Sequence, residues 1–155
     1  MKRGSTLILR SAVILLGLII LSICIFVLFP IISSGEITGP YLPILIGLYI
    51  PAIPFFVALY HAMKVLNYID QNNAFSNKSI HALKRIKYCA IIISIIFAVG
   101  LPYIYYAAQV DDAPGVLAIA LIIAFASATI ATAAGVLQTL VQNAVDIKSE
   151  NDLTV

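Results

Sequence analysis

The sequence predicts an all-α polytopic membrane protein with four transmembrane helices in an antiparallel bundle. Three observations lead to this fold class. The chain of 155 residues is 62% hydrophobic and only 10% charged, so it lacks the charged surface that a soluble domain needs. Four apolar stretches divide it, and each is long enough to cross a hydrocarbon layer of about 30 Å. All 9 Lys and Arg residues can be placed on one side of that layer.

The distribution of charge also predicts how the chain is oriented. Basic residues precede the first apolar stretch, cluster between the second and third, and follow the fourth. The other two connections carry no Lys or Arg, and their charged residues are Glu36, Asp111 and Asp112. Because short basic loops are not translocated, we expect both termini on the cytoplasmic side of the membrane. A basic inner face of this kind can also contact anionic lipid headgroups.

The first two spans are predicted over residues 7–32 and 41–63. The uncharged part of the first is longer than the apolar core of a signal peptide, about 7–15 residues. We therefore expect an uncleaved helix in which Arg10 reaches the inner headgroups. An interior proline removes a backbone donor, so Pro51 and Pro54 predict a kink that faces protein. A gating hinge at the same prolines is the alternative.

A helical connecting segment is predicted over residues 64–87, beyond the lipid. Apolar residues recur in it with the period of a helix, before and after a polar turn. Ser76 is a candidate N-cap for the second of these helical parts. The third span, residues 88–109, then continues the helix, and Gly100 and Pro102 predict a second kink.

The fourth span is predicted over residues 114–137, followed by an amphipathic stalk over residues 138–148. We expect the apolar stripes of the second, third and fourth helices to bury one another outside the lipid. The tail after the stalk is expected to be frayed. Small residues recur every four positions and let helices approach closely, either within this single domain (1–155) or in a homodimer. The predicted packing residues are Ala120, Ala124, Ala128, Thr132, Ser127, Ala131 and Gly135.

The residue pattern does not favour catalysis. The centres of the four spans hold no ionisable side chain, which argues against a proton-coupled transporter or an ion pump. Serines in the spans have no base at a matching depth. His61, His81 and Cys89 do not have the spacing of a known metal site. We therefore expect a non-enzymatic protein without a metal or a cofactor.

The connecting segment and the stalk are the most individual parts of the sequence. Their basic, aromatic and amide side chains are candidates for docking a protein partner. Anchoring to anionic headgroups is the alternative reading of the same residues. The candidate docking residues are Tyr68, Phe75, Lys78, His81, Lys84, Arg85, Lys87, Gln138 and Gln142.

Three segments resemble one bacterial family. The opening MKRGST, the stretch LNYIDQNNAFSNKSIHALKRIKYCA and the end NAVDIKSENDLTV are similar to the family called domain of unknown function 2975. The resemblance runs along nearly the whole chain and implies a four-span protein of the bacterial inner membrane. Family members are often encoded beside a small helix-turn-helix regulator, which implies a membrane component that controls a transcription factor. The family defines no catalytic or binding residues, so none is carried over.

Two functional hypotheses follow. The first is a regulatory or sensor protein that binds a cytosolic helix-turn-helix regulator and does not itself bind nucleic acid. The second is a small transporter, export accessory or immunity protein that uses the kinked second and third spans as a path. The second hypothesis predicts a cavity beside Pro51, Pro54, Gly100 and Pro102.

Overall fold

The computed structural model describes residues 3–35 and 42–153, and these residues form four α-helices. The helices are α1 (Arg3–Ser34), α2 (Leu42–Asp70), α3 (Asn77–Val110) and α4 (Pro114–Leu153). All four are long and apolar enough to cross a membrane, so the fold class predicted from the sequence is confirmed. Lys2, Glu36 and the expected start of the second span at residue 41 lie outside the described residues.

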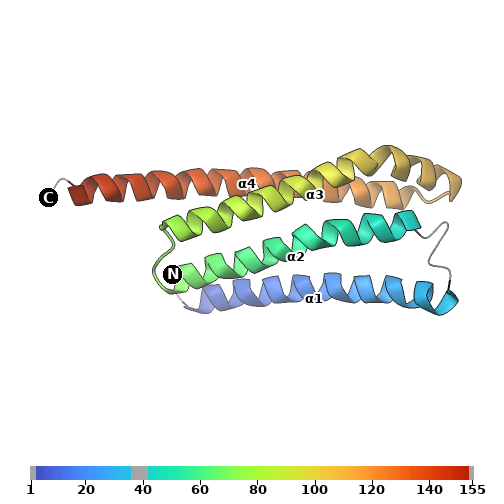
Figure 1. Cartoon of the computed structure of the whole chain (residues 1–155), viewed down its shortest axis with the longest axis horizontal. Helices are drawn as coiled ribbons and strands as arrows, with labels where there is room; N and C mark the ends of the chain where they lie inside the picture. Colours follow the sequence, from blue (N-terminus) through green and yellow to red (C-terminus); the bar gives the residue numbers. More distant parts are fainter. Residues whose placement is uncertain (1–2, 36–41, 154–155) are drawn as a thin grey trace.

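The four helices lie side by side as an open row of antiparallel neighbours (Figure 1). Within the described part of the chain α1 contacts only α2, and α4 contacts only α3. The α3–α4 interface is the most extensive, followed by the α2–α3 interface and then by that between α1 and α2. The row therefore leaves α1 with one protein neighbour, and most of its surface is available to lipid.

The ends of the helices explain where the chain turns. Gly35, Asn72 and Asp112 each have a positive φ, of 69°, 58° and 51°, just beyond α1, α2 and α3. The left-handed conformation ends a helix, and Gly, Asn and Asp are the residues that adopt it most easily. After α2 the amide of Asn73 donates to the carbonyl of Tyr68 at 2.7 Å, which closes the turn.

The N-cap predicted for the helix after this turn is confirmed. The hydroxyl oxygen of Ser76 accepts a hydrogen bond from the amide of Ser79 at 3.4 Å, and α3 starts at the next residue, Asn77. An N-cap side chain satisfies one of the backbone donors that a helix leaves unpaired at its start. The fourth helix begins at Pro114, and proline is well suited to a first helical position because its φ is already helical.

Two expectations about the helix ends were wrong. The tail after residue 148 was expected to be frayed, but α4 continues without a break to Leu153. The apolar stripes of α2 and α4 were expected to bury one another outside the lipid, but these two helices do not touch among the described residues. The physical reason is the open row: α3 lies between them, so α4 has only one helix to pack against.

Proline does not end the helices at the predicted kinks. α2 continues through Pro51 and Pro54, and α3 continues through Gly100 and Pro102. Figure 1 shows α3 changing direction in its last third, where the ribbon passes from yellow to tan. A long helix tolerates an interior proline when its other backbone hydrogen bonds are intact, but the helix bends at that point.

Candidate functional site

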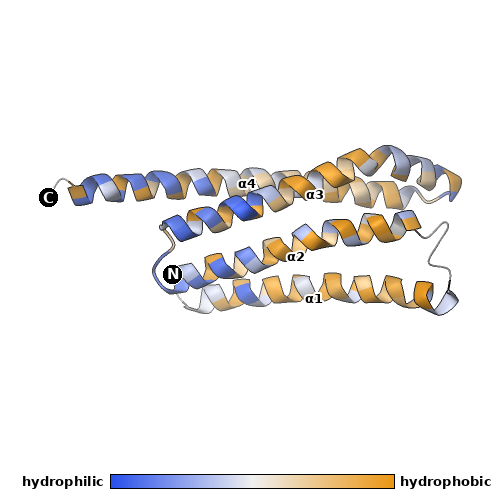
Figure 2. Ribbon diagram, viewed as in Figure 1, coloured by the Kyte–Doolittle hydropathy of each residue, from blue (hydrophilic) through white to orange (hydrophobic). Residues whose placement is uncertain are grey.

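The polar and charged residues gather at one end of the molecule, which is called the basic end below. It contains the start of α1, the α2–α3 turn and the last part of α4 (Figure 1). Figure 2 shows this end as predominantly hydrophilic, whereas the remainder of α1, α2 and α3 is mostly hydrophobic. The structure thus places the predicted connecting segment and the predicted stalk at the same end.

The first turns of α3 present most of the candidate basic side chains. Lys78, His81, Lys84 and Arg85 are exposed, and Lys87 is half-buried. The ammonium groups of Lys84 and Lys87 lie over the ring of Tyr88, at 5.9 Å and 5.2 Å from its centre. A cation over an aromatic face is held by the quadrupole of the ring. The ring of Tyr88 therefore holds two positive charges close together on α3 at the basic end.

The two aromatic candidates of the α2–α3 connection differ in exposure. Tyr68 is half-buried near the end of α2, whereas the side chain of Phe75, just before α3, is 63% exposed. Ser79 is almost fully buried beside the turn, and its hydroxyl donates to the carbonyl of Asn73 at 3.1 Å. The turn itself is thus well anchored, and Phe75 is the large apolar group that it presents outward.

The predicted stalk, residues 138–148, is extended by α4 to Leu153, and the name is used below for Gln138–Leu153. The end of the stalk projects past the start of α3 (Figure 1). Gln138 is half-buried, and its side-chain amide oxygen is buried without a hydrogen-bond partner. Gln142 is exposed, and its side-chain amide donates to Asp146 at 3.1 Å. Leu140 and Ile147 are 57% and 67% exposed. The stalk therefore carries apolar side chains that no other helix covers.

A second polar cluster joins α1 to α2 at the basic end. The guanidinium of Arg10 donates to Asp70 at 2.6 Å and also to the side-chain oxygen of Asn67. Arg10, which was expected to reach the inner headgroups, thus also has an acidic partner on the neighbouring helix. The side chains of Arg10 and Asp70 are 30% and 28% exposed, so the pair is partly shielded from water.

The small residues predicted for helix packing divide into two groups. Ala120, Ser127 and Ala131 are buried against α3, and Ala124 is half-buried. The hydroxyl of Ser94 on α3 donates to the carbonyl of Ala124 at 3.2 Å, which ties the two backbones together. Close approach of this kind depends on small side chains at the interface.

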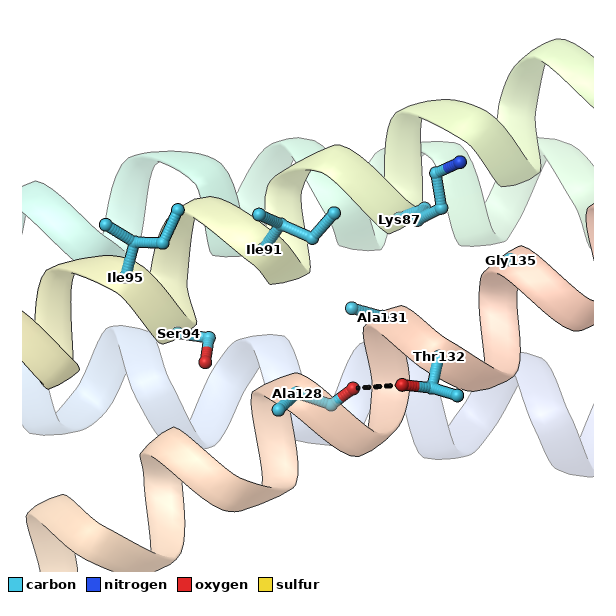
Figure 3. A pocket seen from close by; sticks show the side chains of 8 residues that line it. All are labelled: Lys87, Ile91, Ser94, Ile95, Ala128, Ala131, Thr132 and Gly135. Atoms are coloured by element: carbon cyan, nitrogen blue, oxygen red, sulfur yellow. Dashed lines mark hydrogen bonds between the residues drawn. The ribbon is translucent and has the colours of Figure 1, made fainter.

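The remaining small residues line a groove between α3 and α4. Ala128 and Thr132 are exposed and Gly135 is half-buried. Together with Lys87, Ile91, Ser94, Ile95 and Ala131 they surround an open cavity of about 410 Å³, shown in Figure 3. A Cβ added to Gly135 would come within 3.2 Å of the Cδ of Lys87, so the stem of that lysine rests on the glycine.

The kink residues do not form a site with any of these groups. Pro51 is buried and Pro54 is half-buried, whereas Gly100 is half-buried and Pro102 is exposed. None of the four lines the α3–α4 groove. The predicted kinks are therefore separate from this groove.

The structure also places the residues considered for metal binding. His61 is half-buried beside the ring of Tyr60 and its Nδ1 has no hydrogen-bond partner, whereas His81 is exposed. Cys89 is buried as a free thiol. In the ranges that the structure describes, no three His, Cys, Asp or Glu side chains come together as a metal site would require.

Two features of the site were missed by the sequence reasoning. The Arg10–Asp70 pair could have been suspected, because Asp70 and Asn67 are three residues apart and so share a helix face near the depth of Arg10. The groove gave a weaker signal. Its small residues on α4 were recognised, but their counterparts Ile91, Ser94 and Ile95 on α3 have no pattern that distinguishes them from other residues of a span.

Four apolar helices with a polar end define an α-helical polytopic membrane protein. The sequence model described as "Protein of unknown function (DUF2975)" matches residues 32–155, so the chain belongs to that family. It is also 50% identical over 160 residues to the "Uncharacterized membrane protein YoaS" of Bacillus subtilis (strain 168), and the alignment covers 100% of both chains. The opening MKRGST lies outside the family match but within that alignment. No solved structure matches the chain significantly.

Proposed function

We propose that this protein is a non-enzymatic regulatory component of the bacterial inner membrane. Its basic end faces the cytoplasm and binds a small cytosolic helix-turn-helix regulator. The orientation is supported by the sequence positions of Lys and Arg, which occur only at or before the start of the first span, around the α2–α3 connection and after the fourth span, since basic loops are retained on the cytoplasmic side. The partner class is supported by the resemblance to the family, whose members are often encoded beside such a regulator.

The uncovered stalk is the observation that carries this proposal. Leu140 and Ile147 expose apolar surface on a helix that extends beyond the rest of the molecule. An amphipathic helix with no partner is a common docking element, because a second protein can bury its apolar side. The exposed Lys78 and Lys84 on α3 add positive charge at the same end, which would select an acidic partner surface.

The chain itself is not proposed to bind nucleic acid. Its role is to hold the regulator at the membrane or to release it in response to a signal. The transporter hypothesis gains nothing from the structure, since the cavity between α3 and α4 has no lining residue from the predicted kinks at Pro51, Pro54, Gly100 and Pro102.

The proposal is tested by crosslinked co-purification of the tagged protein from its native membrane, with identification of the recovered proteins by mass spectrometry. The test variant is Leu140→Ala/Ile147→Ala, which truncates two exposed apolar side chains of the stalk. Recovery of a small helix-turn-helix protein is expected to fall at least about tenfold, as for loss of an apolar anchor at an interface.

The matched control is Ile119→Ala/Ile122→Ala, which removes exposed apolar side chains of α4 far from the stalk. Recovery should be unchanged in this control. Reporter fusions after Gly35, Asn73 and Asp112 check that each variant is inserted as the charge pattern predicts. The fusion after Asn73 should lie in the cytoplasm, and the other two should lie outside. Equal recovery from the stalk variant and the control would refute docking on the stalk, and recovery of no DNA-binding protein would refute the partner class.

A further inference from the structure

The α3–α4 groove is apolar along its length, although two hydroxyl groups lie in its wall. The hydroxyl of Thr132 donates to the carbonyl of Ala128 at 3.0 Å, drawn in Figure 3, and that of Ser94 donates to the carbonyl of Ala124 at 3.2 Å. Both groups are satisfied within the protein, so neither requires a polar ligand. An occupant of the groove therefore meets mainly methyl and methylene groups.

One end of the groove is cationic. Figure 3 shows Lys87 at the end that also holds Gly135, with its ammonium directed away from α4. The ammonium of Lys87 lies over the ring of Tyr88, and the ammonium of Lys84 lies over the same ring at 5.9 Å from its centre. In the part of the chain that the structure describes, neither lysine forms an ion pair with a carboxylate. The positive charge at this end is therefore available to an anion.

The dimensions of the groove match one leaflet of a membrane. From Lys87 to Ile95 the helix rises about 12 Å at 1.5 Å per residue. Half of a hydrocarbon layer is about 15 Å thick. With Lys87 at the headgroup level of such a leaflet, Ile91 and Ile95 would lie at successive depths within it. A chain of methylenes that enters beside Lys87 would lie along the groove.

From these observations we propose that the α3–α4 groove binds an anionic phospholipid of the leaflet at the basic end. One acyl chain fills the groove over Ala128 and Thr132, and the phosphate of the headgroup pairs with Lys87, with Lys84 as a second positive charge. Charge complementarity selects the headgroup, and the apolar wall selects the tail. This site is separate from the stalk and does not depend on the proposed protein partner.

Native mass spectrometry of the full-length protein, released from nanodiscs of equal parts phosphatidylglycerol and phosphatidylcholine, tests this proposal. We expect one phosphatidylglycerol to be retained per chain in preference to phosphatidylcholine. The variant Lys87→Gln should lower that preference about fivefold, the factor expected for one lysine at an anionic surface. Lys78→Gln is the control, because it removes an exposed charge of α3 outside the groove.

A second pair of variants tests the groove itself. Ala128→Leu places a larger side chain at an exposed position in the wall of the open cavity. Ala133→Leu makes the same change at another exposed position of α4 that does not line the cavity. Retention of the lipid should be lost in the first variant and kept in the second, while both remain folded by circular dichroism.

Three outcomes would overturn the proposal. The first is equal retention of phosphatidylglycerol and phosphatidylcholine by the natural chain, which would remove the headgroup selectivity. The second is equal retention by Ala128→Leu and Ala133→Leu, which would place the lipid elsewhere. The third is displacement of the lipid by millimolar inorganic phosphate, which would show a free-anion site rather than a lipid site.

Discussion

The two outer pairs of the row, α1–α2 and α3–α4, are held together in different ways. The α3–α4 pair has an extensive interface lined by small buried residues such as Ala120 and Ala131. The α1–α2 pair has the least extensive interface, and polar links support it near both ends. At the basic end Arg10 pairs with Asp70, and nearer the other end the hydroxyl of Tyr49 donates to the carbonyl of Cys24 at 2.6 Å.

This difference reflects the two means by which helices associate in lipid. Lipid provides no hydrophobic drive between apolar helices, so they associate through close packing or through polar contacts. α4 supplies the small side chains that close packing requires, whereas α1 is rich in Leu and Ile and offers few of them. The comparison suggests a rigid α3–α4 unit and an α1 that is attached mainly at separate polar points.

The largest effect is expected from filling the α3–α4 interface. Ala120 is 4% exposed, so Ala120→Leu would force the two backbones apart and should destabilise the protein by about 1–3 kcal/mol. Unfolding in mixed micelles with increasing sodium dodecyl sulfate, followed by circular dichroism, measures the change. Ala118→Leu on the exposed side of α4 is the matched control. Similar unfolding of both variants would contradict the assignment of this interface as the tightest one.

A smaller effect is expected when the Arg10–Asp70 pair is broken. Arg10→Gln should cost about 1 kcal/mol, the upper range for partly exposed ion pairs, and should increase hydrogen exchange in the first turns of α1. Asp70→Asn should have a similar effect. If the two residues act as a pair, the double variant should lose less stability than the two single variants together. Strictly additive losses would argue against a direct interaction.

The smallest effect is expected at the hydrogen bond between Tyr49 and Cys24. Tyr49→Phe removes only the hydroxyl and should cost roughly 0.6 kcal/mol, the typical value for a hydrogen bond between membrane helices. The same unfolding assay measures it, with Tyr103→Phe as a control at an exposed tyrosine of α3. A loss as large as that from Ala120→Leu would mean that α1 depends chiefly on this contact.

The sequence was sufficient to predict the class of fold and several local features. Spans of about 20 apolar residues follow from the thickness of the lipid, and the N-cap at Ser76 follows from the chemistry of a helix start. Both depend on neighbouring residues only. The family assignment was also reached from quoted segments of the chain and is confirmed by the match over residues 32–155.

The order of the helices and the groove could not be predicted in the same way. Two rows of small residues, one through Ala128 and one through Ala131, are equally suited to packing by their spacing. Which members of each row become buried depends on the angle at which α4 crosses α3, and this angle is set by all the contacts of the pair. The crossing buries Ala131 and leaves Ala128 in the wall of a groove.

The unbroken length of α4 has a mechanical consequence. Its 40 residues contain no proline after the first position, so the helix can act as a single stiff lever about 60 Å long. The arm from Gly135 to Leu153 measures roughly 27 Å, and a tilt of about 10° at the groove would move its tip by about 5 Å, close to one helical turn. A small change within the membrane would thus be enlarged at the far tip of the stalk.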